Sequence, residues 1–180
     1  MKSLSLFLLI VLPVSFLVAQ DTNAWRQDGK TIADTPNMKS KNGFGAQLFL
    51  TESAQFFEDW NKPDTPKLTT LEKNKARRNV PIFTVILFVD PGTDANGAAE
   101  VTCDIIVRKP DGTVYGEQKD VVGWKGKYIV PAHNLQLTEG HMGIRIEPQD
   151  PSGIYTVEAI VRDKIKKIEL PLKASFEVPK

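Results

Sequence analysis

The last stretch of the chain, residues 168–178, constrains the fold more than any other part of the sequence. Apolar and polar side chains alternate there without interruption. The six apolar positions are Ile168, Leu170, Leu172, Ala174, Phe176 and Val178. A strict period of two places one set of side chains on each face of a β-strand. The pattern therefore predicts a strand with one face in a hydrophobic core and the other in water.

The segments before this strand predict further antiparallel β structure. Residues 155–161 alternate in the same way, and the polar link 162–167 makes the two runs a hairpin. Residues 82–89 are apolar on both faces, which is typical of a central strand that is covered on both sides. Residues 101–108 end in the turn sequence Lys-Pro-Asp-Gly-Thr at 109–113. We therefore expect an all-β domain.

The first 19 residues are typical of a secretory signal peptide. Lys2 supplies a positive start, residues 4–18 are almost wholly apolar, and Ala19 is a small residue at a suitable cleavage position. A membrane anchor is the alternative, but the apolar run of about 15 residues is shorter than the ~20 that a spanning helix needs. No Cys follows the run, which argues against a lipid-anchored bacterial lipoprotein. The sequence thus predicts an exported protein, located in the periplasm or secreted.

The charge balance and the cysteine count narrow the classes of partner. Removal of residues 1–19 removes one charged residue, Lys2, and reduces the 23 basic residues to 22, against 22 acidic ones. A neutral chain has no global attraction for nucleic acid or anionic membranes, so we expect no nucleic-acid partner and no stable membrane insertion after cleavage. Cys103 is the single cysteine, which excludes an internal disulfide. Its phase with Val101 and Ile105 predicts a buried thiol.

Two aromatic features precede the first long strand. Residues 20–45 are polar, glycine-rich and without a period, and we expect a flexible N-terminal arm in which Trp25 docks onto the domain. Residues 54–62 predict a short helix whose Phe56, Phe57 and Trp60 lie mostly on one side. A stripe at helical spacing is usually part of a core. We therefore expect this helix to cover the outer face of the strand at 82–89, rather than to present an aromatic platform.

The residues around 150–178 resemble the end of an immunoglobulin-like sandwich. The turn Asp150-Pro151-Ser152-Gly153 leads into Gly-x-Tyr-x-apolar, followed by a hairpin and a long alternating last strand. In this resemblance Tyr155 takes the tyrosine-corner position, and Val157 stands where antibody domains carry their second Cys. The sequence departs from the antibody pattern because it has no disulfide pair and no obvious core Trp on the third strand.

The resemblance covers residues 80–178 and is to immunoglobulin-like modules of bacterial envelope and secreted proteins. It implies an immunoglobulin-like antiparallel β-sandwich over residues 46–180, with the N-terminal arm and one short covering helix as additions. It carries no functional residues across, because function resides in sites grafted onto a fold. Pro171 cannot donate a ladder hydrogen bond, so it predicts an edge position or a bulge in the last strand.

The sequence offers few candidates for a chemical site. Residues 94–100 supply oxygen ligands, and Asp94-x-Asn96-Gly97 matches part of a calcium loop, but Cys103 stands where an EF-hand needs its bidentate acid. Turn chemistry alone accounts for this loop. The basic cluster at 67–78 can bind an anionic surface or form a solvated segment; the absence of interleaved aromatics favours the solvated segment.

Two histidines, His133 and His141, complete the inventory. They lie eight residues apart, without Cys or acidic ligands at zinc spacing, and therefore do not predict a metal centre. With Asp120 they are the least unsuitable candidates for a loop-built active site in residues 116–142. We predict no catalytic residue, no metal site and no cofactor.

These observations favour a non-enzymatic binding or structural protein that acts through protein–protein contacts in the bacterial periplasm or cell envelope. Other envelope or secreted proteins are the expected partners, and they could use the edge strand near Pro171, the arm around Trp25, or the loops at one end of the sandwich. The alternative is a loop-built enzyme or enzyme inhibitor in the same compartment, with its site in residues 116–142.

Overall fold

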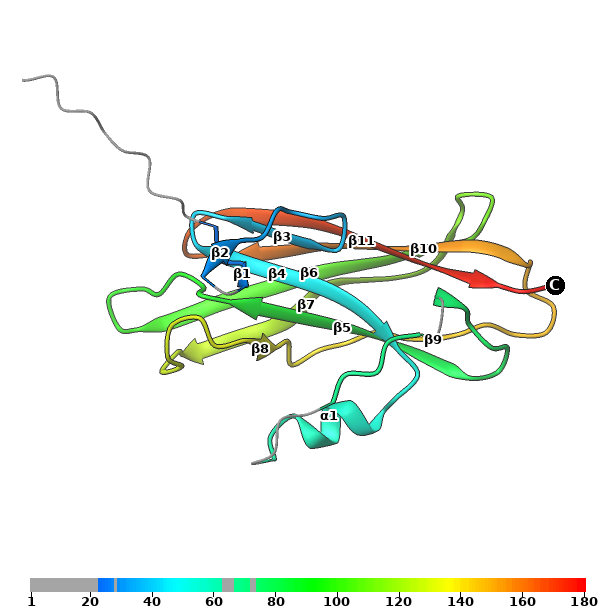
Figure 1. Ribbon diagram of the computed structural model, residues 1–180, viewed down its shortest axis with the longest axis horizontal. Coiled ribbons are helices and arrows are strands. Elements are labelled where there is room, and N and C mark those ends of the chain that lie inside the picture. The colour runs from blue at the N-terminus through cyan, green and yellow to red at the C-terminus, as the bar shows by residue number, and fades with distance from the viewer. Residues whose placement is uncertain (1–22, 28, 63–66, 72–73) are drawn as a thin grey trace, which may run out of the picture.

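Two antiparallel sheets packed face to face form the body of the protein (Figure 1). The computed structural model describes residues 23–27, 29–62, 67–71 and 74–180, so the predicted signal peptide at 1–19 lies outside the described residues. The elements in chain order are β1 (Arg26–Gln27), β2 (Lys30–Thr31), β3 (Met38–Lys41), β4 (Phe44–Thr51), α1 (Gln55–Asp59), β5 (Pro81–Val89), β6 (Ala98–Arg108), β7 (Val114–Lys127), β8 (Gln136–Leu137), β9 (Gly143–Arg145), β10 (Gly153–Asp163) and β11 (Ile168–Val178).

The two sheets contain strands from different parts of the chain. One sheet has the order β11-β10-β6-β7, and the other has the order β3-β4-β5-β8, with β9 also pairing with β5. In the first sheet the last strand pairs with the penultimate one, which pairs with β6; strands G, F and C of immunoglobulin domains are arranged in the same way. Strands β1 and β2 form a separate two-stranded ribbon.

The C-terminal hairpin is confirmed. Strands β10 and β11 pair antiparallel from Gly153 opposite Val178 to Asp163 opposite Ile168. Five of the six apolar residues of β11 are buried and Ala174 is half-buried, while the residues between them are exposed. The Tyr155 hydroxyl donates to the Pro151 carbonyl oxygen at 3.0 Å, which is the backbone contact expected of a tyrosine corner. The predicted fold class, an immunoglobulin-like antiparallel β-sandwich with one short helix, is confirmed.

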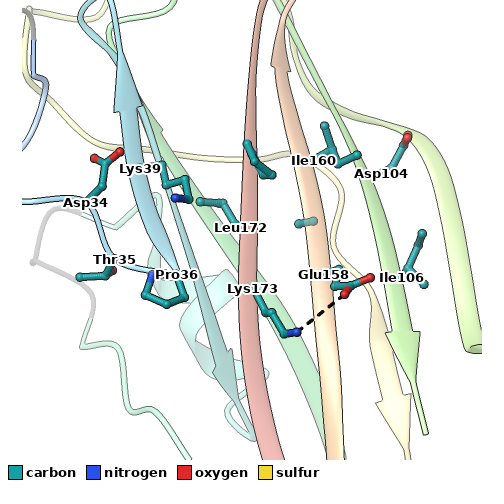
Figure 2. A pocket seen from close by; sticks show the side chains of 12 residues that line it. Asp34, Thr35, Pro36, Lys39, Asp104, Ile106, Glu158, Ile160, Leu172 and Lys173 are labelled. Carbon is teal, nitrogen blue, oxygen red and sulfur yellow. Dashed lines mark ion pairs between the residues drawn. The ribbon is translucent and has the colours of Figure 1, made fainter. Parts of the chain in front are cut away.

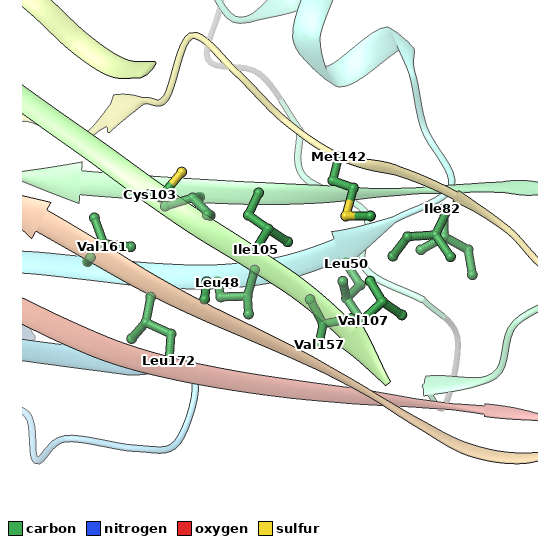
Figure 3. Packing of buried hydrophobic residues seen from close by; sticks show 14 of the residues in the cluster. Leu48, Leu50, Ile82, Cys103, Ile105, Val107, Met142, Val157, Val161 and Leu172 are labelled. Carbon is green, nitrogen blue, oxygen red and sulfur yellow. The ribbon is translucent and has the colours of Figure 1, made fainter. Parts of the chain in front are cut away.

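The main core lies between the sheets (Figure 3). Both sheets contribute alternate residues, among them Leu48 from β4, Ile105 from β6 and Val157 from β10. Cys103 is fully buried in this layer as a free thiol, and burial raises the thiol's pKa to about 12. The prediction of a buried, unreactive cysteine is thus confirmed.

Strand β5 is covered on both faces, as predicted. Ile86 and Phe88 point into the main core, whereas Val85 and Leu87 point to the opposite side. Phe56 of α1 is buried against that side, and Phe57 and Trp60 pack around it half-buried. The aromatic residues therefore cover the sheet and do not form an exposed platform.

The N-terminal segment is more regular than a flexible arm. Trp25 is buried and its indole Nε1 donates to the Lys39 carbonyl oxygen at 2.9 Å, which confirms the expected docking. A Cβ at Gly45 would lie 2.9 Å from Val89 and 3.0 Å from the Trp25 ring, so only glycine fits beneath the indole. Strand β3 joins the sheet and β4 begins at Phe44, so the predicted boundary at residue 46 falls inside a strand. The edge position of β3 explains why its sequence shows no apolar alternation, because an edge strand can be polar on both faces.

Strand β7 covers residues 114–127, where the sequence shows no clear alternation of apolar and polar residues. It runs as one edge strand beside β6, with three register shifts along the pair. Asp120 has a φ of 49° at one of these irregularities. Bulges displace side chains from strict alternation, and its glycines remove apolar contacts. These features hide a strand of 14 residues from a periodicity analysis.

Candidate interaction surface

The outer face of the sheet β11-β10-β6-β7 carries a groove with a volume of about 590 Å³ (Figure 2). Ile106 of β6, Ile160 of β10 and Pro171 of β11 supply apolar surface on the face that points away from the core. Both isoleucines fall out of phase with the buried residues of their strands, and both are half-buried. The complete lining consists of Asp34, Thr35, Pro36, Lys39, Asp104, Ile106, Glu158, Ala159, Ile160, Pro171, Leu172 and Lys173.

The second wall of the groove comes from the N-terminal segment at residues 34–39. The Lys173 backbone N–H donates to the Pro36 carbonyl oxygen at 2.7 Å, which attaches the segment to the free edge of β11. Asp34 accepts a hydrogen bond from the Ser40 backbone N–H at 3.0 Å. The wall is therefore held by one backbone–backbone bond to β11 and by one bond from a backbone N–H to the Asp34 carboxylate.

Two ion-pair clusters flank the apolar strip. In the first, the Arg162 guanidinium contacts Asp104 at 2.7 Å and Glu169 at 2.9 Å. In the second, Glu158 contacts Arg108 at 2.9 Å and Lys173 at 4.0 Å. Each cluster joins residues of the neighbouring strands β6, β10 and β11 across the outer face. Both clusters therefore link these strands and border the groove.

The hydrogen bond from Arg162 lowers the pKa of Asp104 to about 2, against the opposing effect of burial. The Asp120 backbone N–H, at 2.9 Å from Asp104, acts in the same direction. Asp104 therefore stays ionised across the physiological range and is not suited to transfer protons. An apolar centre bordered by polar groups matches the layout of protein interfaces, which have an apolar core and a polar rim.

We expect the protein to lose stability in acid as Asp104 is protonated and its ion pair with Arg162 is lost. A carboxylate with a pKa of about 2 when folded and about 3.9 when unfolded stabilises fully above pH ~4 and loses its contribution as the pH falls towards ~2. Solvent screening reduces the contribution to about 1–2 kcal/mol. Urea unfolding of the native protein and of Arg162→Met across this range measures it. The native protein should lose more stability than the variant, and equal losses would contradict the assignment.

The three candidates for a loop-built active site have different surroundings. His133 is exposed, and its Nδ1 lies 2.7 Å from Asp90 Oδ2. His141 stacks on the Phe57 ring with the centroids 4.0 Å apart, and burial lowers the histidine's pKa. Asp120 is exposed on β7, where its backbone N–H binds Asp104. The contacts of these residues therefore do not unite them in one constellation.

The loop considered for calcium is closed by its own hydrogen bonds. Asp94 Oδ1 accepts from the backbone N–H groups of Asn96 at 2.8 Å and Ala98 at 2.9 Å. These bonds lower the pKa of Asp94 and account for the turn. Within the described residues, no group of three or more His, Cys, Asp or Glu side chains is arranged to hold a metal ion.

The basic cluster at 67–78 is divided by its contacts. Arg77 binds Glu52 with the nitrogen and oxygen 2.5 Å apart. Arg78 donates to the carbonyl oxygens of Glu147 and Asp150, at 2.8 and 2.9 Å. These contacts attach the segment to its neighbours, while Lys73 lies outside the described residues. These contacts engage Arg77 and Arg78, and the interpretation of the cluster as a solvated segment stays a prediction.

The edge near Pro171 is partly occupied. Strand β11 is the outermost strand of its sheet, with Pro171 opposite Ile160, so the predicted edge position is confirmed. The Lys173 N–H is used by Pro36, and the Glu177 carbonyl oxygen accepts from the Ala76 N–H at 2.9 Å. These contacts shorten the edge available for strand addition. The groove was not predicted, because the two out-of-phase isoleucines, its one local signal, resemble ordinary exposed apolar residues.

The comparisons with known proteins give distant structural likenesses. No protein-family model and no curated protein matches the sequence. The chain is similar to a family 123 glycoside hydrolase from Clostridium perfringens, with a TM-score of 0.43 and 14% identity over 76% of this chain and 27% of the hydrolase. It is also similar to a Niemann-Pick type C2 protein from the Japanese carpenter ant, with a TM-score of 0.35 and 14% identity over 57% of this chain and 76% of that protein. Neither likeness bears on the activity of this chain.

Proposed function

We propose that this is an exported, non-enzymatic binding or structural module that acts through protein–protein contacts in the bacterial periplasm or cell envelope. The groove on the outer face of the four-stranded sheet is the observation that carries the proposal. It combines apolar surface from Ile106 and Ile160 with two clusters of charges that are already paired. Interfaces of this kind have an apolar centre and a polar rim. The compartment rests on the predicted signal peptide at residues 1–19.

A photo-crosslinking amino acid at position 160 tests the proposal in the producing cell. We expect a discrete adduct with another exported protein, because a partner seated in the groove would contact this side chain directly. The same amino acid at Gln149, an exposed loop position, is the matched control and should give no such adduct.

A second substitution makes the experiment specific for the groove. Ile106 is half-buried in the apolar strip of the groove. Ile106→Arg places a charge there and should abolish the adduct formed from position 160. Circular dichroism of this variant checks that the fold is retained. The proposal is contradicted if positions 160 and 149 give the same adducts, or if Ile106→Arg folds and leaves the adduct unchanged.

Among the described residues, no helix is long and apolar enough to cross a bilayer. The groove lies on the outer face of the sheet, away from the connections at the two ends of the sandwich.

A further inference from the structure

A second surface lies at the end of the sandwich opposite the C-terminus (Figure 1). Three connections lie there (Figure 1): residues 90–97 between β5 and β6, residues 128–135 between β7 and β8, and the turn at 164–167 between β10 and β11. The second and third carry apolar side chains in water. Ile129 is 88% exposed, Leu135 41% and Ile165 38%. We call residues 125–135 and 164–167 together the lysine-rich end, because lysines flank the exposed apolar residues in the sequence.

The lysines of this end have few competing contacts. Lys125 and Lys127 precede the first connection, and Lys164 and Lys167 belong to the second; all four are exposed. Within the described part of the chain, none of these four forms an ion pair. Two lysines on other surfaces form ion pairs, Lys62 with Asp59 and Lys119 with Glu117. The charges of the lysine-rich end therefore remain available for a ligand.

Hydrogen bonds hold the three connections together. The His133 backbone N–H donates to Asp90 Oδ1 at 2.8 Å, and Lys166 Nζ donates to the Asp90 carbonyl oxygen at 2.9 Å. Asp163 is buried and accepts from the backbone N–H groups of Gly92, Ile165 and Lys166. The carboxylates of Asp90 and Asp163 are thus engaged internally. Of the other acidic residues here, Asp94 closes its own turn and Glu100 lies opposite Lys125 in the register of β6 and β7 without forming an ion pair with it.

We propose that the lysine-rich end docks reversibly on an anionic lipid surface. Ile129 enters the boundary between headgroups and acyl chains, and the four free lysines lie over the lipid phosphates. Apolar residues among basic ones bind such interfaces through buried area and electrostatic attraction together. A protein partner is less suitable, because the isoleucines stand on separate projecting connections and do not form a continuous face. The proposal goes beyond the groove and leaves it accessible.

Cosedimentation of the exported protein with vesicles tests the proposal. We expect binding to phosphatidylcholine vesicles that contain phosphatidylglycerol, weak binding to phosphatidylcholine alone, and a fall in binding as salt is added. Each lysine near a charged surface contributes about a fivefold factor, so Lys125→Gln with Lys127→Gln should weaken binding about 30-fold. Ile129→Ser should weaken it about tenfold through lost apolar burial.

The matched control is Lys62→Gln with Lys119→Gln, which changes the net charge equally at ion-paired positions elsewhere. It should change binding less than about twofold, because these positions do not lie at the lysine-rich end. The proposal is overturned if the control weakens binding as much as the paired variant does. Equal binding to neutral vesicles also overturns it, and so does a native chain that binds neither kind of vesicle, which would leave an acidic protein as the occupant of this end.

Discussion

Replacing Phe176 by alanine is expected to lower the free energy of unfolding by about 3–5 kcal/mol. Phe176 is 1% exposed and its ring stacks on Tyr155 with the centroids 5.3 Å apart. The two residues lie opposite each other in the register of β10 and β11. Truncation therefore removes the apolar contacts of a whole ring and leaves a cavity that the paired strands cannot close without breaking their register.

Equilibrium unfolding in urea, followed by far-UV circular dichroism, measures this loss. Ile154→Ala is the matched control, since Ile154 lies in β10 beside Tyr155 but is 63% exposed. It should change stability by less than about 0.5 kcal/mol. A loss of about 1 kcal/mol or less for Phe176→Ala would mean that the tail strand does not belong to the core, and the account of the fold would then be wrong.

The strands that the sequence predicted are those with one-sided or complete burial. Strands β10 and β11 alternate because one face meets the core, and β5 is apolar on both faces, apart from Thr84, because α1 covers its second face. Burial of this kind leaves a pattern within a single segment, so no knowledge of the neighbours is needed. Trp25 was also placed correctly, since a large aromatic residue in a polar segment has much to gain from docking.

The strands without a clear local pattern lie at sheet edges. β3 is polar and short, and β7 is interrupted by glycines and register shifts. Edge strands tolerate both features, and natural proteins use them to discourage pairing with other chains. Their positions follow from which strand they border, which is information that a local pattern does not contain.

The groove could not be predicted because its parts are far apart in sequence. Its walls come from residues 34–39, 104–106, 158–160 and 171–173. Ile106 and Ile160 stand among polar residues on the outer face, and each alone resembles an ordinary exposed apolar side chain. Only the pairing of β6 with β10 places them on one face, and only the Pro36–Lys173 hydrogen bond supplies the second wall.

Replacing Asp163 by alanine is expected to cost about 3 kcal/mol of stability and to weaken binding to anionic vesicles. Its carboxylate is 1% exposed and accepts three backbone hydrogen bonds, from Gly92 at 2.6 Å and from Ile165 and Lys166 at 2.9 Å. Hydrogen bonds to a charged group contribute about 1.5–3 kcal/mol each, and donors left unpaired in the interior add a penalty, although the three terms are not additive.

Asp94→Ala provides the comparison for Asp163, because Asp94 also closes a turn by accepting two backbone hydrogen bonds but is exposed. Water can replace its oxygens, so we expect a loss below about 1 kcal/mol. The second readout is vesicle binding: without Asp163 the turn at 164–167 is no longer attached to Gly92, so its lysines are no longer held in a fixed position on the lysine-rich end. If Asp163→Ala stays folded in the assay and binds phosphatidylglycerol vesicles as tightly as the native protein, the lysine-rich end does not depend on the arrangement described for it. Equal stability losses for the two variants would instead show that the buried carboxylate is no more important to the fold than a turn in water.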